Sequence, residues 1–139
     1  MQVDEMAMYL AWIPRDLDMV VLPNLYGDII SDLCAGLVGG LGVAPGMNLG
    51  KEYAVFEPTH GSAPDIAGRG IANPIAMMLS ATLMLRHLDF NQEADTLEEA
   101  IARVLRERKV VPADLRPAGA PATTDAITNA VIDALTLDP

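Results

Sequence analysis

The 139-residue sequence has few basic side chains, since nine lysines and arginines face 19 aspartates and glutamates and leave a net charge of −10. A surface of this charge repels phosphate backbones and anionic lipid headgroups, so we expect neither nucleic acid nor membrane as a partner. Long hydrophobic runs are also scarce. The longest, residues 71–88, contains Pro74 and ends in Arg86 and His87, which predicts no membrane span.

Cysteine is equally scarce. The single cysteine, Cys34, excludes an internal disulfide and a cysteine-based zinc site, and its apolar neighbours predict a buried, inert thiol. The first residues show no basic stretch followed by an apolar one, so we expect no signal peptide. These features are typical of a reducing compartment, and we expect a cytoplasmic location.

The residues that are present predict a folded α/β chain. Hydrophobic residues make up 51% of the sequence, enough for a packed core at this length. Apolar spacing predicts five helices: over 3–12, from Gly27 to the glycine-rich stretch that begins at Gly36, over 74–88, around 97–105, and one capped by Thr123–Asp125. Short apolar runs predict two strands, over 18–22 and 53–56, so helices and strands alternate as in an α/β chain. Two strands are too few for a stable parallel sheet, which indicates part of a larger protein.

Two aspartates form the first candidate site. Asp28 and Asp32 are four residues apart near a helix start, so their carboxylates share one face, with the Cβ atoms about 6 Å apart. A hard divalent cation such as Mg²⁺ or Mn²⁺ would relieve their repulsion. The alternative is that both acids only interact with the helix dipole. Asp4, a lone acid near another helix start, is on its own no more than a helix cap.

A polar loop after the strand at 53–56 forms the second candidate. Its small residues, from Thr59 to Gly68, would let a ligand approach the backbone, and the carboxylate of Asp65 could accept hydrogen bonds from ribose hydroxyls. That charge would also repel a 2′-phosphate and favour NAD over NADP. The alternative is an ordinary surface loop with one histidine, because the sequence contains no GxGxxG, P-loop or nucleophile-elbow motif.

Four strings of residues occur in the same order as in one enzyme family. They are VDEMAM from Val3, NLYGDIISD from Asn24, EPTHGSAPDIAG from Glu57 and GIANP from Gly70. On these strings the chain resembles the C-terminal part of the isocitrate and isopropylmalate dehydrogenases, which are metal-dependent β-decarboxylating dehydrogenases. The resemblance extends over essentially the whole chain, and the stretch from Asn24 to Asp28 is highly specific.

The resemblance implies a fold and its division. The family fold is α/β, with two domains around a central sheet, and is not a Rossmann fold; this chain would be only its C-terminal portion. We expect residues 1–39 to be part of the small domain, which carries metal ligands and forms the dimer. We expect residues 40–139 to be the C-terminal part of the large domain, which carries the cofactor loop.

The resemblance also implies an activity and its ligands. In that family NAD or NADP oxidises a small 2-hydroxy acid, the product loses CO₂, and Mg²⁺ or Mn²⁺ binds the substrate. Asp28 and Asp32 would bind the metal of one subunit and Asp4 that of its partner, which makes the active site shared within a homodimer. The cofactor-binding residues implied are His60, Gly61, Ser62, Ala63, Pro64, Asp65, Ile66 and Asn73, and Asp65 with Ile66 matches the NAD-preferring pattern.

Other parts of the family machinery have no counterpart here. The family's catalytic tyrosine and lysine and its substrate-binding serine and arginines lie upstream of the matched strings, so we expect no catalytic residue in this chain. We expect the enzyme to convert isocitrate to 2-oxoglutarate with NAD, and this chain to be a fragment inactive by itself. The alternatives are a 3-isopropylmalate, homoisocitrate or tartrate dehydrogenase, or a non-catalytic, truncated dimerisation module.

Overall fold

A computed structural model describes residues 1–115 and 118–136, and the chain divides into two compact units, Met1–Gly40 and Leu41–Pro139. The division follows Gly39 and Gly40, whose φ angles of 129° and 114° are open to glycine but costly for residues with a β-carbon. It lies one residue from the predicted position. The assignment of the two parts to a small and a large domain stays a prediction.

The first unit contains two helices, α1 (Val3–Trp12) and α2 (Asn24–Val38), which contact each other. The predicted bounds of α1 are confirmed, and the helix ends before Pro14 because proline has no backbone N–H to continue it. Helix α2 begins three residues before the predicted start. The Gly27 amide already donates to the Pro23 carbonyl at 2.8 Å, which closes the first turn.

The strand predicted over residues 18–22 is wrong, because these residues form no strand. Met19 and Val21 are 84% and 86% exposed. A strand needs a neighbouring backbone to pair with its N–H and C=O groups, and the described residues contain no such neighbour for this segment. Cys34, predicted to be buried, is half-buried.

The second unit starts with an antiparallel hairpin of β1 (Pro45–Leu49) and β2 (Ala54–Pro58), in which Met47 lies opposite Phe56. Strand β2 overlaps the strand predicted over 53–56. Strand β1 was not predicted, because its proline and glycine are typical of a turn. Gly46 serves the pairing, since a β-carbon there would lie 3.0 Å from the Glu57 carbonyl oxygen.

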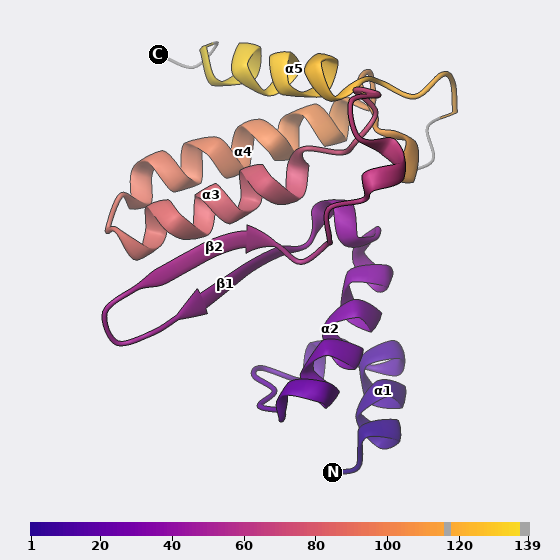
Figure 1. Ribbon diagram of the computed structural model, residues 1–139, viewed down its shortest axis with the longest axis vertical. Coiled ribbons are helices and arrows are strands. Elements are labelled where there is room, and N and C mark those ends of the chain that lie inside the picture. Colours follow the sequence, from indigo (N-terminus) through magenta and orange to yellow (C-terminus); the bar gives the residue numbers. More distant parts are fainter. Residues whose placement is uncertain (116–117, 137–139) are drawn as a thin grey trace. The chain divides into compact units, whose positions relative to one another are not determined.

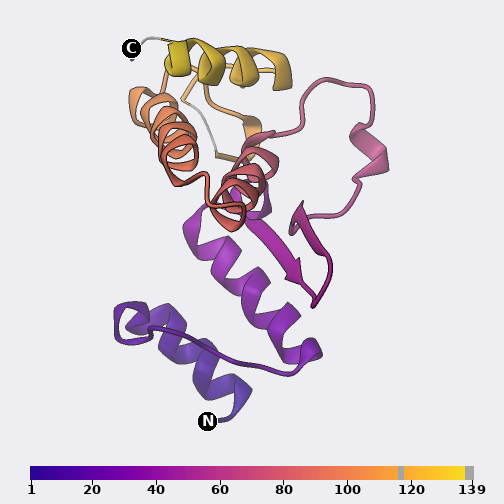
Figure 2. The same cartoon turned by 90° about the vertical axis from the view of Figure 1, so that its left-hand side faces the viewer.

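Three helices are layered on this hairpin in chain order: α3 (Ile75–His87), α4 (Asn91–Glu107) and α5 (Thr124–Thr136). Helix α3 contacts both strands and α4, and α4 contacts α5 (Figures 1 and 2). All three predicted helices are thereby confirmed. The segment between β2 and α3 stands out from the helices as an open loop with a short 3-10 turn, η3 (Pro64–Ile66) (Figure 2).

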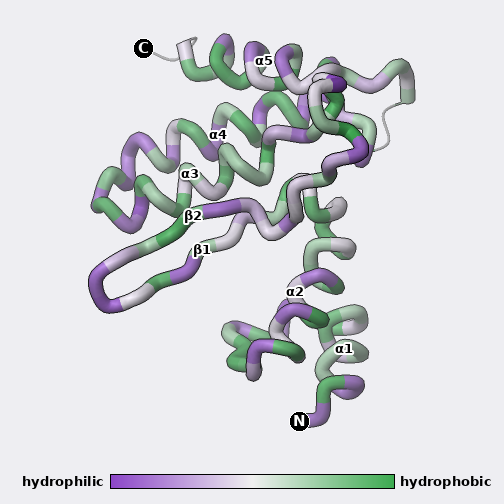
Figure 3. Tube along the Cα trace, viewed as in Figure 1, coloured by the Kyte–Doolittle hydropathy of each residue, from purple (hydrophilic) through white to green (hydrophobic). Residues whose placement is uncertain are grey.

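The core of the second unit lies where these helices meet. Its buried members are Ile75, Ala100, Ile101, Val104, Ile127, Val131 and Ala134. Helix α4 alternates between hydrophilic and hydrophobic residues, whereas α3 is hydrophobic or neutral over most of its length (Figure 3). Because α3 contacts the hairpin as well as α4, a helix that is apolar nearly all round is what this position requires.

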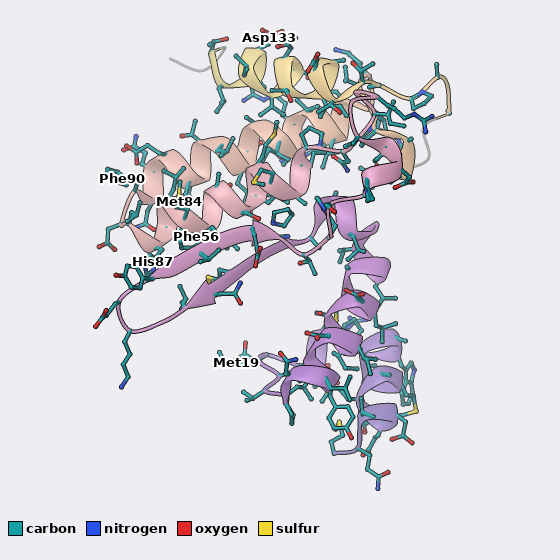
Figure 4. The ribbon with its side chains drawn as sticks, viewed as in Figure 1. Met19, Phe56, Met84, His87, Phe90 and Asp133 are labelled. Atoms are coloured by element: carbon teal, nitrogen blue, oxygen red, sulfur yellow. The ribbon has the colours of Figure 1, made fainter. Side chains whose placement is uncertain are left out.

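The end of α3 is fixed by polar and aromatic contacts. Arg86 donates to Glu98 at 2.6 Å and to Asp95 at 2.7 Å on α4, and these hydrogen bonds raise the pKa of its guanidinium above the ordinary value. The rings of His87 and Phe56 lie 5.5 Å apart and join α3 to β2 (Figure 4).

Among the described residues, no helix is long and apolar enough to cross a membrane.

Candidate functional site

Asp28 and Asp32 lie one turn apart on helix α2 and are both exposed. The helical geometry places them on one face, as the sequence spacing predicts. Within the part of the chain that the structure describes, neither carboxylate forms a hydrogen bond or ion pair. The contact at this point comes from the Ser31 hydroxyl, which donates to the backbone carbonyl of Asp28 at 3.1 Å. Both carboxylates are therefore free to accept an external ligand.

Asp4 lies in the first turn of α1, where one of its carboxylate oxygens accepts a hydrogen bond from the Glu5 amide at 2.9 Å. This is a local contact with the next residue and not an N-cap, since the N-cap of α1 is Gln2, and it leaves the second oxygen of Asp4 free. Asp4 also lines a hollow of about 800 Å³ within the first unit, together with Val20, Leu22 and Tyr26 among others. One carboxylate oxygen of Asp4 is therefore available to a ligand at the wall of this hollow.

The three acids do not form a complete metal site in one chain. Within residues 1–115 and 118–136, no three histidine, cysteine, aspartate or glutamate side chains form a group that could hold a metal ion. The pair on α2 has the donor chemistry of a Mg²⁺ or Mn²⁺ ligand, because both metals bind hard carboxylate oxygens. Two carboxylates fill only part of an octahedral shell, so further oxygens from substrate, water or another chain would be needed.

The predicted cofactor loop has an irregular backbone with small side chains. Ala63 has a left-handed conformation with φ 43°, which turns the chain into η3, and the Ile66 amide then donates to the Ala63 carbonyl at 3.1 Å. Gly68 and Gly70 also have positive φ, of 74° and 64°. The amides of Ile66, Ala67 and Arg69 donate within the loop, whereas among the described residues those from His60 to Ala63 have no partner and are open to a ligand.

The side chains of this loop are exposed from His60 to Asp65, and Ile66 is half-buried. The Nδ1 atom of His60 lies 2.8 Å from the Gly61 carbonyl oxygen. Because a carbonyl only accepts, Nδ1 carries the proton, and in the neutral ring Nε2 is left as an acceptor. The Asp65 carboxylate offers only acceptor oxygens. The loop thus combines an acceptor pair suited to hydroxyl groups with a backbone that a flat ligand can approach closely.

Asn73 closes the loop just before α3 and is held on both sides of its carboxamide. Its Oδ1 accepts from the Ile75 amide at 3.0 Å, and its Nδ2 donates to the Asp114 carboxylate at 3.0 Å. Asp114 belongs to the 3-10 turn η4 (Ala113–Leu115), 41 residues further along the chain. A long-range contact therefore sets the orientation of a predicted cofactor-binding side chain.

A second anchor holds the backbone next to Asn73. Thr124, the first residue of α5, donates from its amide to the Gly70 carbonyl at 2.9 Å and from its hydroxyl to the Ala72 carbonyl at 2.6 Å. The other end of the loop is held where the Thr59 amide donates to the Ala44 carbonyl at 3.1 Å. Both ends of the predicted cofactor loop are thus attached to the helical layer or the hairpin.

Asp114 and Thr124 were not predicted from the sequence as residues of this site. They are 41 and 51 positions beyond Asn73, and neither lies in a motif or shows a periodicity that points to the loop. The structure brings His60 to Ile66 together on one loop, with Asn73 at its end. Asp4, Asp28 and Asp32 belong to the other compact unit.

Comparison with known proteins gives a uniform result. The model of the family described as isocitrate/isopropylmalate dehydrogenase matches residues 1–131. A mitochondrial catalytic subunit of NAD isocitrate dehydrogenase from Arabidopsis thaliana is 51% identical over 96% of this chain, which covers 35% of that protein. The isocitrate/homoisocitrate dehydrogenase of Thermus thermophilus is 54% identical over 96% of this chain, which covers 39% of that protein.

A solved structure matches equally well. The crystal structure of isocitrate dehydrogenase from Methylococcus capsulatus has a TM-score of 0.90 to this chain at 41% identity, over 96% of this chain and 39% of that one. The predicted fold class is confirmed, because the chain has a portion of the α/β fold of that enzyme. The chain spans only 35–39% of the length of the two curated relatives.

Proposed function

The chain belongs to the isocitrate/isopropylmalate dehydrogenase family, and we propose that it forms part of an enzyme that oxidises and decarboxylates a small 2-hydroxy acid with NAD. Isocitrate is the proposed substrate, which is supported by the isocitrate dehydrogenases among the relatives. The alternatives are 3-isopropylmalate, after which the family is also named, and homoisocitrate, which the name of the Thermus thermophilus relative includes.

The single observation that carries this proposal is the pair of exposed carboxylates, Asp28 and Asp32, on one face of α2. Their oxygens are the proposed ligands from this chain for Mg²⁺ or Mn²⁺. A bound divalent cation supplies Lewis-acid polarisation of the substrate hydroxyl and carboxylate. Asp4 is the proposed ligand toward the site of a second subunit, which is supported by its free oxygen at the wall of a hollow.

The loop from His60 to Ile66, with Asn73, is the proposed NAD site of this chain. Its small side chains would let the cofactor approach the backbone amides. The Asp65 carboxylate would accept hydrogen bonds from ribose hydroxyls, and its charge would disfavour a 2′-phosphate, so the proposal is NAD rather than NADP. Support comes from the exposure of the loop and from the fixed carboxamide of Asn73.

The proposed assembly is a homodimer with a shared active site. Trp12, Met19 and Val21 in the first unit are each more than 70% exposed, and apolar side chains of this size are typical of surfaces that another chain covers. The proposed location is cytoplasmic, as expected for a chain with one cysteine and no disulfide.

The activity is tested with two polypeptides: this 139-residue chain, and the same chain extended by the portion of its relatives that it does not cover. With isocitrate, NAD and Mg²⁺, we expect NADH from the extended protein and none from the chain alone, which has no proposed catalytic residue. NADH from 3-isopropylmalate or homoisocitrate instead would reassign the substrate. An extended protein that stays silent with all three substrates would contradict the proposed activity and favour a non-catalytic dimerisation module.

Metal binding is tested on the chain itself with Mn²⁺, whose unpaired electrons broaden the NMR signals of nearby amides. We expect broadening around Asp28 and Asp32, and its loss in the double variant Asp28→Asn/Asp32→Asn. The control Asp16→Asn/Asp18→Asn removes the same charge from exposed positions in the same unit and should keep the broadening. Broadening that survives in the first variant would refute the ligand assignment.

A further inference from the structure

The anchored end of the cofactor loop carries an inference beyond the ligands already named. We propose that Asp114 and Thr124 are positioning residues that hold the segment Gly70–Asn73 in the geometry that binds NAD. This inference rests on the proposed function, since it requires NAD to bind at the loop. We refer to the three hydrogen bonds from these two residues to the segment as the loop clamp.

The first half of the clamp orients the Asn73 carboxamide. A carboxylate only accepts hydrogen bonds, so Asp114 must face the Nδ2 side of Asn73, while the Ile75 amide faces Oδ1. Both contacts agree on one orientation of the amide. Nδ2 has two hydrogens and Asp114 uses one of them, which leaves one N–H of fixed direction for an acceptor atom of the cofactor.

The second half of the clamp fixes the backbone. Thr124 uses both its amide and its hydroxyl on the loop, and the two carbonyls that it binds, those of Gly70 and Ala72, flank Ile71. Gly70 has φ 64°, a region with few constraints of its own for glycine. The clamp therefore limits the segment where the local backbone would otherwise be most free.

Gly42 shows how closely the clamp is packed. A β-carbon added at Gly42 would overlap the Oδ2 atom of Asp114 and would lie 2.8 Å from Nδ2 of Asn73, the two atoms that form the hydrogen bond. Asp114 is exposed, so its carboxylate can move away from such a methyl group. The substitution Gly42→Ala should thus displace Asp114 from Asn73 without removing either side chain.

The test is an NMR titration of the full 139-residue chain with millimolar NAD, which measures the dissociation constant from shifts in residues 60–73. We expect Asp114→Ala to weaken NAD binding about fivefold and Thr124→Val about threefold, since one charged and one neutral hydrogen bond are lost at a partly exposed site. Asp114→Asn keeps an acceptor oxygen and should return the affinity to within about twofold of wild type. Gly42→Ala should resemble Asp114→Ala, and combining the two should add little, because both break the same contact.

Matched controls separate the clamp from general effects. Glu52→Ala removes one charge from the exposed hairpin turn, and Thr128→Val removes a hydroxyl that bonds only within α5, to the Thr124 carbonyl at 2.9 Å. Both should bind NAD as wild type does. Mn²⁺ binding at Asp28 and Asp32 should be unchanged in every clamp variant. Even without NAD, hydrogen exchange of the Ile75 amide, which donates to Asn73, should rise in Asp114→Ala, and that of the amide of residue 124, which donates to Gly70, should rise in Thr124→Val.

The outcomes distinguish the proposed NAD site from the clamp. A wild-type chain whose loop signals do not respond to NAD overturns the proposed NAD site, and the clamp falls with it. A wild-type chain that binds NAD while Asp114→Ala and Thr124→Val bind it equally well overturns the clamp alone. Two further outcomes also overturn the clamp. If NAD binding stays weak in Asp114→Asn, or if Glu52→Ala weakens it as much as Asp114→Ala does, the loss reflects the charge or stability of the chain and not the hydrogen bonds of the clamp.

Discussion

The burial of Ile127 at the centre of the second unit predicts a large and specific loss of stability. Ile127 is 0% exposed in helix α5, whereas Ile132 on the same helix is 51% exposed. Ile127→Ala removes three carbon atoms from the core, which costs about 2.4 kcal/mol at about 0.8 kcal/mol per buried methylene. The cavity left behind adds to this, so we expect a total loss of about 3–4 kcal/mol.

The control Ile132→Ala makes the same chemical change on the same helix, so any gain in helix propensity is common to both variants. It should cost less than about 1 kcal/mol, because half of the side chain is already in water. Urea unfolding followed by far-ultraviolet circular dichroism measures both losses. Equal losses, or a loss below about 1.5 kcal/mol for Ile127→Ala, would refute the packing of α5 on α4 described above.

Two further predictions concern charge and capping. The hydrogen bond from Lys109 to Glu107 lowers the pKa of Glu107 below its ordinary value of 4.5 and raises the pKa of Lys109 above 10.5. The pair therefore stabilises the fold between these two pH values, and the stabilisation is lost as pH falls through the Glu107 pKa or rises past 10.5. Lys109→Met should move the titration midpoint of Glu107 up toward 4.5 in carbon-13 NMR, and an unmoved midpoint would contradict the pairing. The Thr123 hydroxyl accepts a hydrogen bond from the Ala126 amide at 3.2 Å and so caps α5. Thr123→Ala should lower the free energy of unfolding by about 1 kcal/mol in a thermal melt, whereas Thr96→Ala in the middle of α4 should leave it unchanged or raise it slightly. Equal effects of the two substitutions would refute the cap.

Much of the local structure follows from sequence alone. The apolar spacing of α1, α3, α4 and α5 predicts these helices because each buries a hydrophobic face, and such a face repeats along the sequence with a period of 3.6 residues. The glycines at the end of α2 predict its end for a similarly local reason, since their positive φ angles need no distant partner. Asp28 and Asp32 were placed on one face by helix geometry alone.

The misjudged elements depend on partners that no local pattern specifies. Residues 18–22 have the composition of a strand but form none, since strands are made by a neighbouring backbone and not by apolar side chains. Conversely, β1 contains Pro45 and Gly46, which are typical of a turn, and it becomes a strand because β2 lies beside it.

The candidate site divides in the same way. The sequence by itself determined which residues carry the proposed chemistry, because carboxylates, small loop residues and an asparagine at these positions can be identified in order along the chain. Only the tertiary structure decided what orients them: Asp114 meets Asn73 and Thr124 meets Gly70 across gaps of 41 and 54 residues. Such contacts arise when the packing of α3, α4 and α5 brings η4 and the start of α5 to the loop, and that packing is a property of the folded core rather than of any segment within it.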